Sequence, residues 1–117
     1  MDDQPIEDLQ LTPKMADLLK VFLEDPAKGR YGFELMRCTG QSSAYVYKTL
    51  AKLEWAGWLT AGREDIDPHE AGRPPRRVYF ISGAAVSAAR VQLAELSERY
   101  RPPRPAGPQL QPRGGTL

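Results

Sequence analysis

The apolar residues in the first half of the chain recur every three or four positions, which is the spacing of one buried helix face. A first helix is marked by four of them, Met15, Leu18, Leu19 and Phe22. Thr12 is a suitable N-cap for this helix, and Pro13 occupies its first position, where a missing N–H costs nothing. The helix should end at Asp25-Pro26, because the residue before a proline avoids the α conformation.

Two further helices are predicted, with a short turn between them. Residues 31–38 form the second helix, and Gly40 is placed for the left-handed conformation that follows a helix end. Ser42 or Ser43 caps the third helix, which Gly57 ends. The buried row of this third helix is Val46, Leu50, Leu53 and Ala56. Two short helices joined by about four turn residues are typical of a helix-turn-helix.

The next part of the chain predicts two strands. Residues 77–82 are rich in β-branched and aromatic side chains, and residues 58–63 form a shorter candidate. The loop between them, residues 64–76, is polar and contains glycine and proline, while residues 28–30 are expected to be a simple linker. The expected fold class is therefore mainly α with a small β-hairpin wing (α+β), a winged helix-turn-helix.

A last helix is predicted over residues 83–100. Its apolar residues are spaced three, four, three and four along the chain: Val86, Ala89, Leu93, Leu96 and Tyr100. Such a narrow row favours a partner helix over a domain core, so we expect a dimerisation helix. The other expected units are a flexible acidic arm over 1–10, a winged-helix DNA-binding domain over 11–82 and a disordered Pro/Arg/Gly tail over 101–117.

Composition mainly excludes some kinds of site and some locations for the protein. The 117 residues include 16 basic and 15 acidic side chains, and a net charge of +1 neither favours nor disfavours nucleic acid. Cys38 and His69 are the single residues of their kinds, so we expect no disulfide, no metal and no cofactor, with Cys38 packed in its helix. The sequence has no run of about 18 apolar residues and no signal peptide, so a cytoplasmic protein without membrane insertion is expected.

The outer face of the third helix carries the candidate chemistry. Lysines neutralise phosphates and polar side chains reach base edges, so this face favours DNA binding. Lys48 and Lys52 could instead be solvated surface residues, and Tyr47 could be an aromatic at the edge of the core. The residues of this helix predicted to contact DNA are Ser42, Ser43, Ala44, Tyr45, Tyr47, Lys48 and Lys52.

The loop between the two strands concentrates three arginines, Arg73, Arg76 and Arg77. An arginine at the tip of such a wing can enter the minor groove of DNA, where the potential is most negative. The alternative is a solvated turn. Acidic residues of the same loop offer partners for these arginines when DNA is absent: Asp65, Asp67 and Glu70.

The remaining candidate residues do not indicate catalysis. Trp55 and Trp58 flank the end of the third helix, where packing is the expected role and a flat surface for an aromatic ligand is the alternative. His69 lies in the charged loop without an evident orienting partner, and no glycine-rich phosphate loop is present. We therefore do not expect an enzyme.

An ordered set of motifs over about residues 11–83 resembles the PadR family of bacterial transcription regulators. The motifs are Leu11-Thr12-Pro13, Asp25-Pro26, Tyr31-Gly32-Phe33-Glu34-Leu35, Ser42-Ser43, Val46-Tyr47, Leu50-Ala51-Lys52-Leu53-Glu54, Ala56-Gly57-Trp58-Leu59, Glu64-Asp65, Asp67-Pro68, Gly72-Arg73-Pro74, Arg76-Arg77 and Val78-Tyr79-Phe80. The resemblance implies a homodimer, paired through a single C-terminal helix, that binds near-palindromic operators and commonly represses transcription. Some members release DNA when a phenolic or drug-like ligand binds. Ala44-Tyr45 and Lys48 depart from the family pattern and bear on the operator sequence.

The sequence hypothesis is thus a sequence-specific regulator, a repressor acting as a homodimer on double-stranded DNA. Two alternatives stay open. One is a winged-helix module that binds protein, which the acidic residues around the wing and the small net charge favour. The other is a sensor of a small aromatic effector, reported by Trp55 and Trp58.

Overall fold

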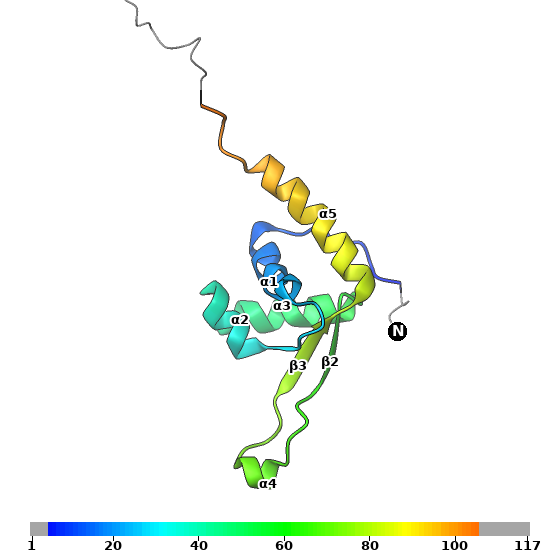
Figure 1. The fold of residues 1–117 in the computed structure, drawn as a ribbon, viewed down its shortest axis with the longest axis vertical. Coiled ribbons are helices and arrows are strands. Elements are labelled where there is room, and N and C mark those ends of the chain that lie inside the picture. Colours follow the sequence, from blue (N-terminus) through cyan, green and yellow to red (C-terminus); the bar gives the residue numbers. More distant parts are fainter. Residues whose placement is uncertain (1–4, 106–117) are drawn as a thin grey trace, which may run out of the picture.

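Three helices, a small sheet and a long C-terminal helix surround one core in the computed structural model, which describes residues 5–105 (Figure 1). In chain order the elements are α1 (Pro13–Glu24), β1 (Arg30–Tyr31), α2 (Gly32–Thr39), α3 (Ser43–Trp55), β2 (Leu59–Arg63), α4 (Pro68–Ala71), β3 (Arg77–Ile81) and α5 (Gly83–Arg99). The wing projects from the body with α4 at its far end, and α5 lies on the opposite side. This is the predicted fold class. Residues 1–4 of the predicted arm and 106–117 of the predicted tail lie outside the described residues.

Local signals place the helix ends as the sequence predicts. The Thr12 hydroxyl accepts a hydrogen bond from the N–H of Met15 at 3.2 Å, which caps α1. The Ser42 hydroxyl accepts one from the N–H of Tyr45 at 3.1 Å, so Ser42 is the cap of α3 and Ser43 its first residue. Gly40 follows α2 with a φ of 71°, a conformation that favours glycine.

The sheet has three strands in the order β1-β3-β2, all antiparallel. The β1 strand is a correction, because the sequence predicts a linker that leads directly into the second helix. Arg30 and Tyr31 pair instead with Tyr79 and Val78 of β3. Gly29 permits this approach, since a side chain there would collide with those of the central strand.

The wing loop contains a short helix that the sequence analysis did not predict. The carboxylate of Asp67 caps α4 by accepting a hydrogen bond from the N–H of His69 at 2.9 Å. Gly72 ends this helix with a φ of 71°. The tip of the wing is therefore an ordered turn of helix within a longer loop.

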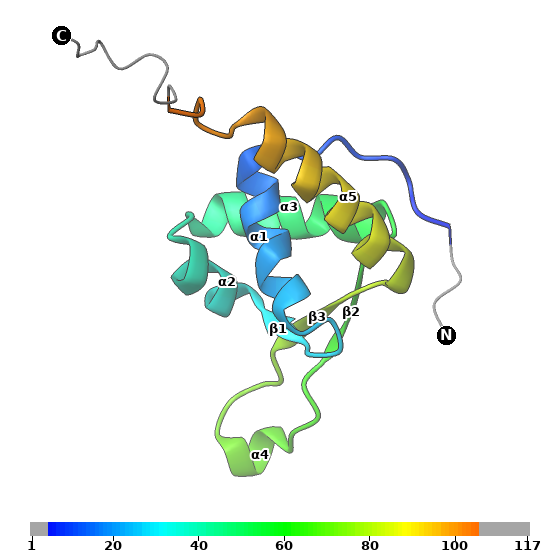
Figure 2. The ribbon, with the colours of Figure 1, turned by 45° about the horizontal axis from the view of Figure 1, so that its top comes forward.

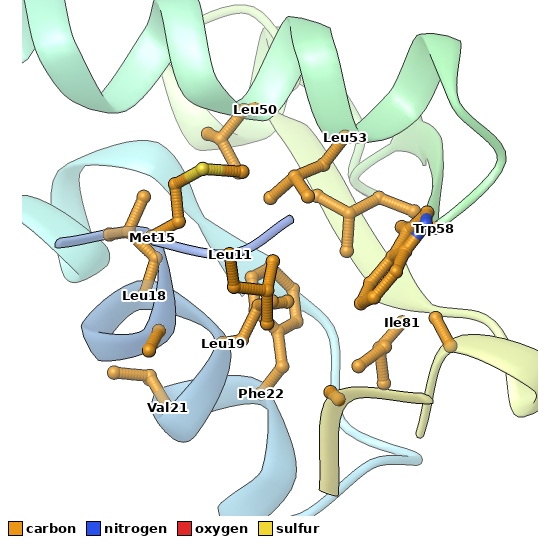
Figure 3. Close-up of a cluster of buried hydrophobic side chains, with 14 of the residues drawn as sticks. Leu11, Met15, Leu18, Leu19, Val21, Phe22, Leu50, Leu53, Trp58 and Ile81 are labelled. Carbon is orange, nitrogen blue, oxygen red and sulfur yellow. The ribbon is translucent and has the colours of Figure 1, made fainter. Parts of the chain in front are cut away.

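The core packs α1 and α3 against the base of the wing (Figure 3). Its largest fully buried side chains are Trp58, Phe22, Leu18, Leu19, Leu35, Leu50, Leu53, Leu59 and Val46. Packing of Trp58 is thus confirmed, and its indole N–H donates to the carbonyl of Glu7 at 2.7 Å. The same expectation is wrong for Trp55, whose side chain is 86% exposed.

Residues 5–10 are not the loose arm that the sequence predicts. The N–H of Glu7 donates to the carbonyl of Ala56 at 2.9 Å, at the end of α3. The side-chain amide of Gln92 in α5 donates to the carbonyl of Leu9 at 2.5 Å. Polar backbone groups beside a core need partners, and these hydrogen bonds attach the segment to both helices.

The apolar row of α5 also requires a correction, because most of it packs on its own domain rather than waiting for a second chain. The helix lies across α1 (Figure 2), and Ala89 and Leu96 are buried there, with exposures of 0% and 8%. Val86 and Leu93 are half-buried against the same core. Only Tyr100, at the end of the row, is largely exposed.

Candidate nucleic-acid interface

The outer face of α3 presents four residues in a row along the helix: Ala44, Lys48, Ala51 and Trp55, all exposed. Their spacing of four, three and four keeps them on one side, opposite the buried row. Lys48 and Lys52 make no ion pair with any described residue. Trp55 is the member of this row that the sequence analysis missed, although the same spacing would have placed it there.

The side chains of Tyr45 and Tyr47 point to opposite sides of this outer face. Tyr45 is half-buried and turned toward α1, where the Lys14 ammonium lies 4.0 Å from the centre of its ring. Tyr47 is turned toward α2 and lies against Gly32, where a side chain would collide with its ring. Its 45% exposure makes Tyr47 an aromatic at the edge of the core with a solvent-accessible surface.

Glu64 organises the base of the wing. Its carboxylate accepts two hydrogen bonds from the Arg73 guanidinium, at 2.7 and 3.1 Å. It also accepts one from the backbone N–H of Arg76 and one from the Tyr31 hydroxyl, both at 3.2 Å. We call Tyr31, Glu64, Arg73 and the backbone of Arg76 the wing cluster. Glu64 supplies the acidic partner for Arg73 that the sequence analysis sought among Asp65, Asp67 and Glu70.

The charges of the wing cluster are fixed over a wide pH range. The hydrogen bonds from Arg73 lower the pKa of the Glu64 carboxyl from the usual 4.5 to about 2. Desolvation, together with the neighbouring Glu64 carboxylate, raises the pKa of the Tyr31 hydroxyl above its usual 10.0. Glu64 therefore remains an acceptor and Tyr31 a donor near neutral pH.

The three predicted wing arginines have different partners. Arg77 donates to both carboxylate oxygens of Glu54, at 2.9 and 3.0 Å, and so ties β3 to the end of α3. Arg73 is held by Glu64. The Arg76 guanidinium has no carboxylate partner in the described part of the chain and lies 4.9 Å from the centre of the Phe33 ring. Arg76 is the arginine of this set that is free to meet an anion.

Two hollows border α3. One, of about 420 Å³, lies toward the wing and is lined by Tyr31, Gly32, Phe33, Tyr47, Arg76 and Arg77. The other, of about 610 Å³, lies toward α1. A third hollow, of about 520 Å³, follows α2 to Cys38, whose thiol is exposed rather than packed as expected, because it faces away from the core.

Neither a metal cluster nor a membrane helix occurs in the described chain. Within residues 5–105, no group of three or more His, Cys, Asp and Glu side chains is arranged to hold a metal ion. None of the helices there has the length and apolar character needed to cross a bilayer.

Known structures share this architecture. MepR of S. aureus, in complex with DNA, matches with a TM-score of 0.60 and 11% identity over 78% of this chain and 68% of MepR. ZitR of Lactococcus lactis, a zinc-responsive member of the MarR family, matches with a TM-score of 0.59 and 17% identity, over 84% of this chain and 62% of ZitR. A ZitR mutant gives a TM-score of 0.57 and 19% identity, over 83% and 67%.

The present chain spans about two thirds of the length of those proteins. No family model matches its sequence, and no curated protein does. At these identities the likeness concerns the arrangement of helices and strands. The chain has the winged helix-turn-helix fold.

Proposed function

We propose that this protein is a sequence-specific, DNA-binding transcription regulator of the PadR type that represses by occupying its operator. The observation that carries the proposal is the outer face of α3, where Lys48 and Lys52 are exposed without acidic partners. The unpaired guanidinium of Arg76 lies on the wing beside the same helix. MepR, which has the same fold, was solved with DNA, and this supports duplex DNA as the partner.

The arrangement suits a helix lying in the major groove. Ser43, Ala44 and Tyr47 belong to the first part of α3, the part that reaches base edges in helix-turn-helix docking. Lys48 and Lys52 follow one and two turns later, within reach of phosphates. Arg76 on the wing then reaches the neighbouring minor groove, while Arg73 and Arg77 hold the wing in place.

Replacing Lys48 with alanine tests this assignment. A lost phosphate contact should flatten the slope of log affinity against log salt by about 0.9, which corresponds to about eightfold weaker binding at 0.1 M salt. Fluorescence anisotropy with duplexes selected from a random pool measures both quantities. Arg90→Ala removes the same charge from an exposed position on α5 and should bind like the unchanged protein. Equal slopes for the two variants would contradict the role of Lys48.

Trp55 favours the second candidate function, a module that binds protein. An indole that is 86% exposed on the outer face of α3 is a common anchor of protein interfaces. The same titration separates the candidates. If the unchanged protein does not bind any duplex at micromolar concentration and low salt, the DNA-binding proposal is wrong and the protein-binding module is favoured.

We also propose that the regulator acts as a homodimer through exposed apolar side chains in the C-terminal half of α5. Tyr100, the last residue of the predicted row, is 62% exposed, and Val91, outside that row, is 58% exposed. The other residues of the row pack on their own core. The double substitution Val91→Asp/Tyr100→Asp should therefore convert a dimer to a monomer in light scattering while circular dichroism shows the same helix content. A dimer mass that survives the double substitution, or a monomeric unchanged protein, would contradict this surface.

A further inference from the structure

The hollow between α1 and α3 gathers positive charge from two helices. Its volume is about 610 Å³, and we call it the lysine hollow because Lys14, Lys48 and Lys52 line it. The other lining residues are Thr12, Pro13, Met15, Tyr45 and Thr49. No carboxylate is among them, so three lysine side chains line this hollow without an acidic side chain beside them.

Lys14 is held at this hollow by two contacts. Its ammonium lies 4.0 Å from the centre of the Tyr45 ring, a favourable cation–π arrangement that positions the charge without neutralising it. Its backbone carbonyl accepts a hydrogen bond from the side-chain amide of Gln41 at 3.0 Å, which ties the start of α1 to the turn before α3. The lysine is therefore placed beside α3 before any ligand arrives.

The lysine hollow and the wing flank α3 on opposite sides. Glu54 faces the wing through its ion pair with Arg77, and Lys52 faces α1 in the hollow. Two residues along an α-helix are separated by about 200° of rotation, so these two side chains diverge by nearly half a turn. Positive groups are thus available on both sides of the helix, Arg76 on one and the three lysines on the other.

We propose that the lysine hollow binds the backbone phosphates of duplex DNA on the side of α3 away from the wing. A major groove has a phosphate backbone along each wall, so a helix lying in it meets phosphates on both flanks. Lys14 thereby becomes a DNA-contacting residue on α1, outside the helix-turn-helix. Phosphate contacts of this kind fix the register of the protein on the duplex, and the inference rests on the proposed function.

The test is a salt titration of duplex binding by Lys14→Gln, with Lys20→Gln as its matched control. Both variants remove one charge from an exposed position of α1, but Lys20 is outside the hollow and pairs with Asp17 at 3.9 Å. We expect Lys14→Gln to flatten the salt slope by about 0.9 and to weaken binding by about eightfold at 0.1 M salt. Lys14→Arg should keep the slope, and Lys20→Gln should match the unchanged protein.

A second variant distinguishes the placement of the Lys14 ammonium from its charge. Tyr45→Leu keeps all three lysines but removes the ring that holds Lys14, so its affinity should fall between those of the unchanged protein and Lys14→Gln. Circular dichroism melts confirm that each variant is folded. The inference would be overturned if Lys14→Gln and Lys20→Gln had the same salt slope, or if both substitutions weakened DNA binding equally.

The outcomes distinguish this inference from the proposed function. If the unchanged protein binds no duplex at low salt, the proposed function itself fails. If it binds and Lys14→Gln is unaffected, the lysine hollow alone is wrongly assigned. In that case, chemical-shift changes of Lys14 and Lys48 on adding inorganic phosphate would assign the hollow to a free anion and reject the DNA backbone as its occupant.

Discussion

Replacing Arg30 with methionine should lower the free energy of unfolding by about 3 kcal/mol. The Arg30 side chain is only 6% exposed, and its guanidinium lies 2.7 Å from the Glu34 carboxylate and 3.6 Å from that of Glu24. Removing one partner of a buried pair leaves the other charge uncompensated, which typically costs about 3–5 kcal/mol. The low end applies here because the Glu34 side chain keeps 24% of its surface in solvent.

This pair also positions the candidate interface. Glu34 accepts a hydrogen bond from the N–H of Tyr31 at 3.3 Å, so the same carboxylate fixes the start of α2. The Tyr31 hydroxyl donates to Glu64 in the wing cluster, and Gly32 leaves room for the ring of Tyr47. A loss at Arg30 is therefore expected to loosen the contact between α2, α3 and the wing as well as the fold.

Urea unfolding followed by circular dichroism measures the effect of Arg30→Met. Arg37→Met is the control, because it removes an exposed arginine from α2 and should change stability by less than about 0.5 kcal/mol. The double substitution Arg30→Met/Glu34→Leu should recover only part of the loss, because it removes the uncompensated charge but also the carboxylate that caps α2. If Arg30→Met unfolds at the urea concentration of the control, the pair does not stabilise the domain.

The parts of the fold that follow from the sequence rest on local signals. The caps at Thr12 and Ser42 and the glycine at position 40 act through neighbouring backbone groups, and all three have the predicted role. The apolar rows of α1 and α3 and the strand β3 also follow the prediction. Hydrogen bonds within a few residues are determined by side-chain types and spacing, which are visible in one sequence.

The parts that do not follow depend on partners far along the chain. The side-chain amide of Gln92 donates a hydrogen bond to the carbonyl of Leu9, which is 83 residues earlier in the chain. This contact attaches the N-terminal segment to α5, whereas the sequence predicts a loose arm. Glu54 likewise forms an ion pair with Arg77, 23 residues further along the chain. Spacing does not distinguish these partners from other acidic or amide side chains, because only the packed fold brings them together. The exposed Trp55 differs, since the helical spacing that placed Lys48 also places Trp55 on the outer face.

Glu64→Gln and Arg73→Gln should both weaken binding to a selected operator, on the order of twentyfold, although they change the net charge in opposite directions. Each substitution breaks the ion pair of the wing cluster, whose distance is 2.7 Å. Arg76 then loses its fixed position, and the phosphate or groove contact of its side chain is worth about eightfold at 0.1 M salt. Ordering the loosened wing on binding costs a further factor of roughly three.

The pH dependence of the wing cluster follows from the two shifted groups. The pKa of Glu64 is lowered from 4.5 to about 2, so its contribution to stability is present above pH 4.5 and is lost as the pH falls toward 2. The pKa of Tyr31 is raised above 10.0, so its contribution is present below pH 10 and is lost at higher pH. Operator affinity of the unchanged protein should therefore not vary through this cluster between about pH 5 and 9.

Because Glu64→Gln and Arg73→Gln change the net charge in opposite directions, comparing them distinguishes an effect of charge from an effect of wing position. If charge alone controlled affinity, Glu64→Gln would bind more tightly and Arg73→Gln more weakly, each by about eightfold at 0.1 M salt. If the wing cluster positions Arg76, both variants bind more weakly, and amide hydrogen exchange of β2 and β3 is faster in both. Glu70→Gln makes the same charge change as Glu64→Gln at an exposed position of α4, outside the cluster, and should not weaken binding. Tighter binding by Glu64→Gln would contradict the positioning role, because that role requires the Glu64–Arg73 ion pair that orders the wing around Arg76.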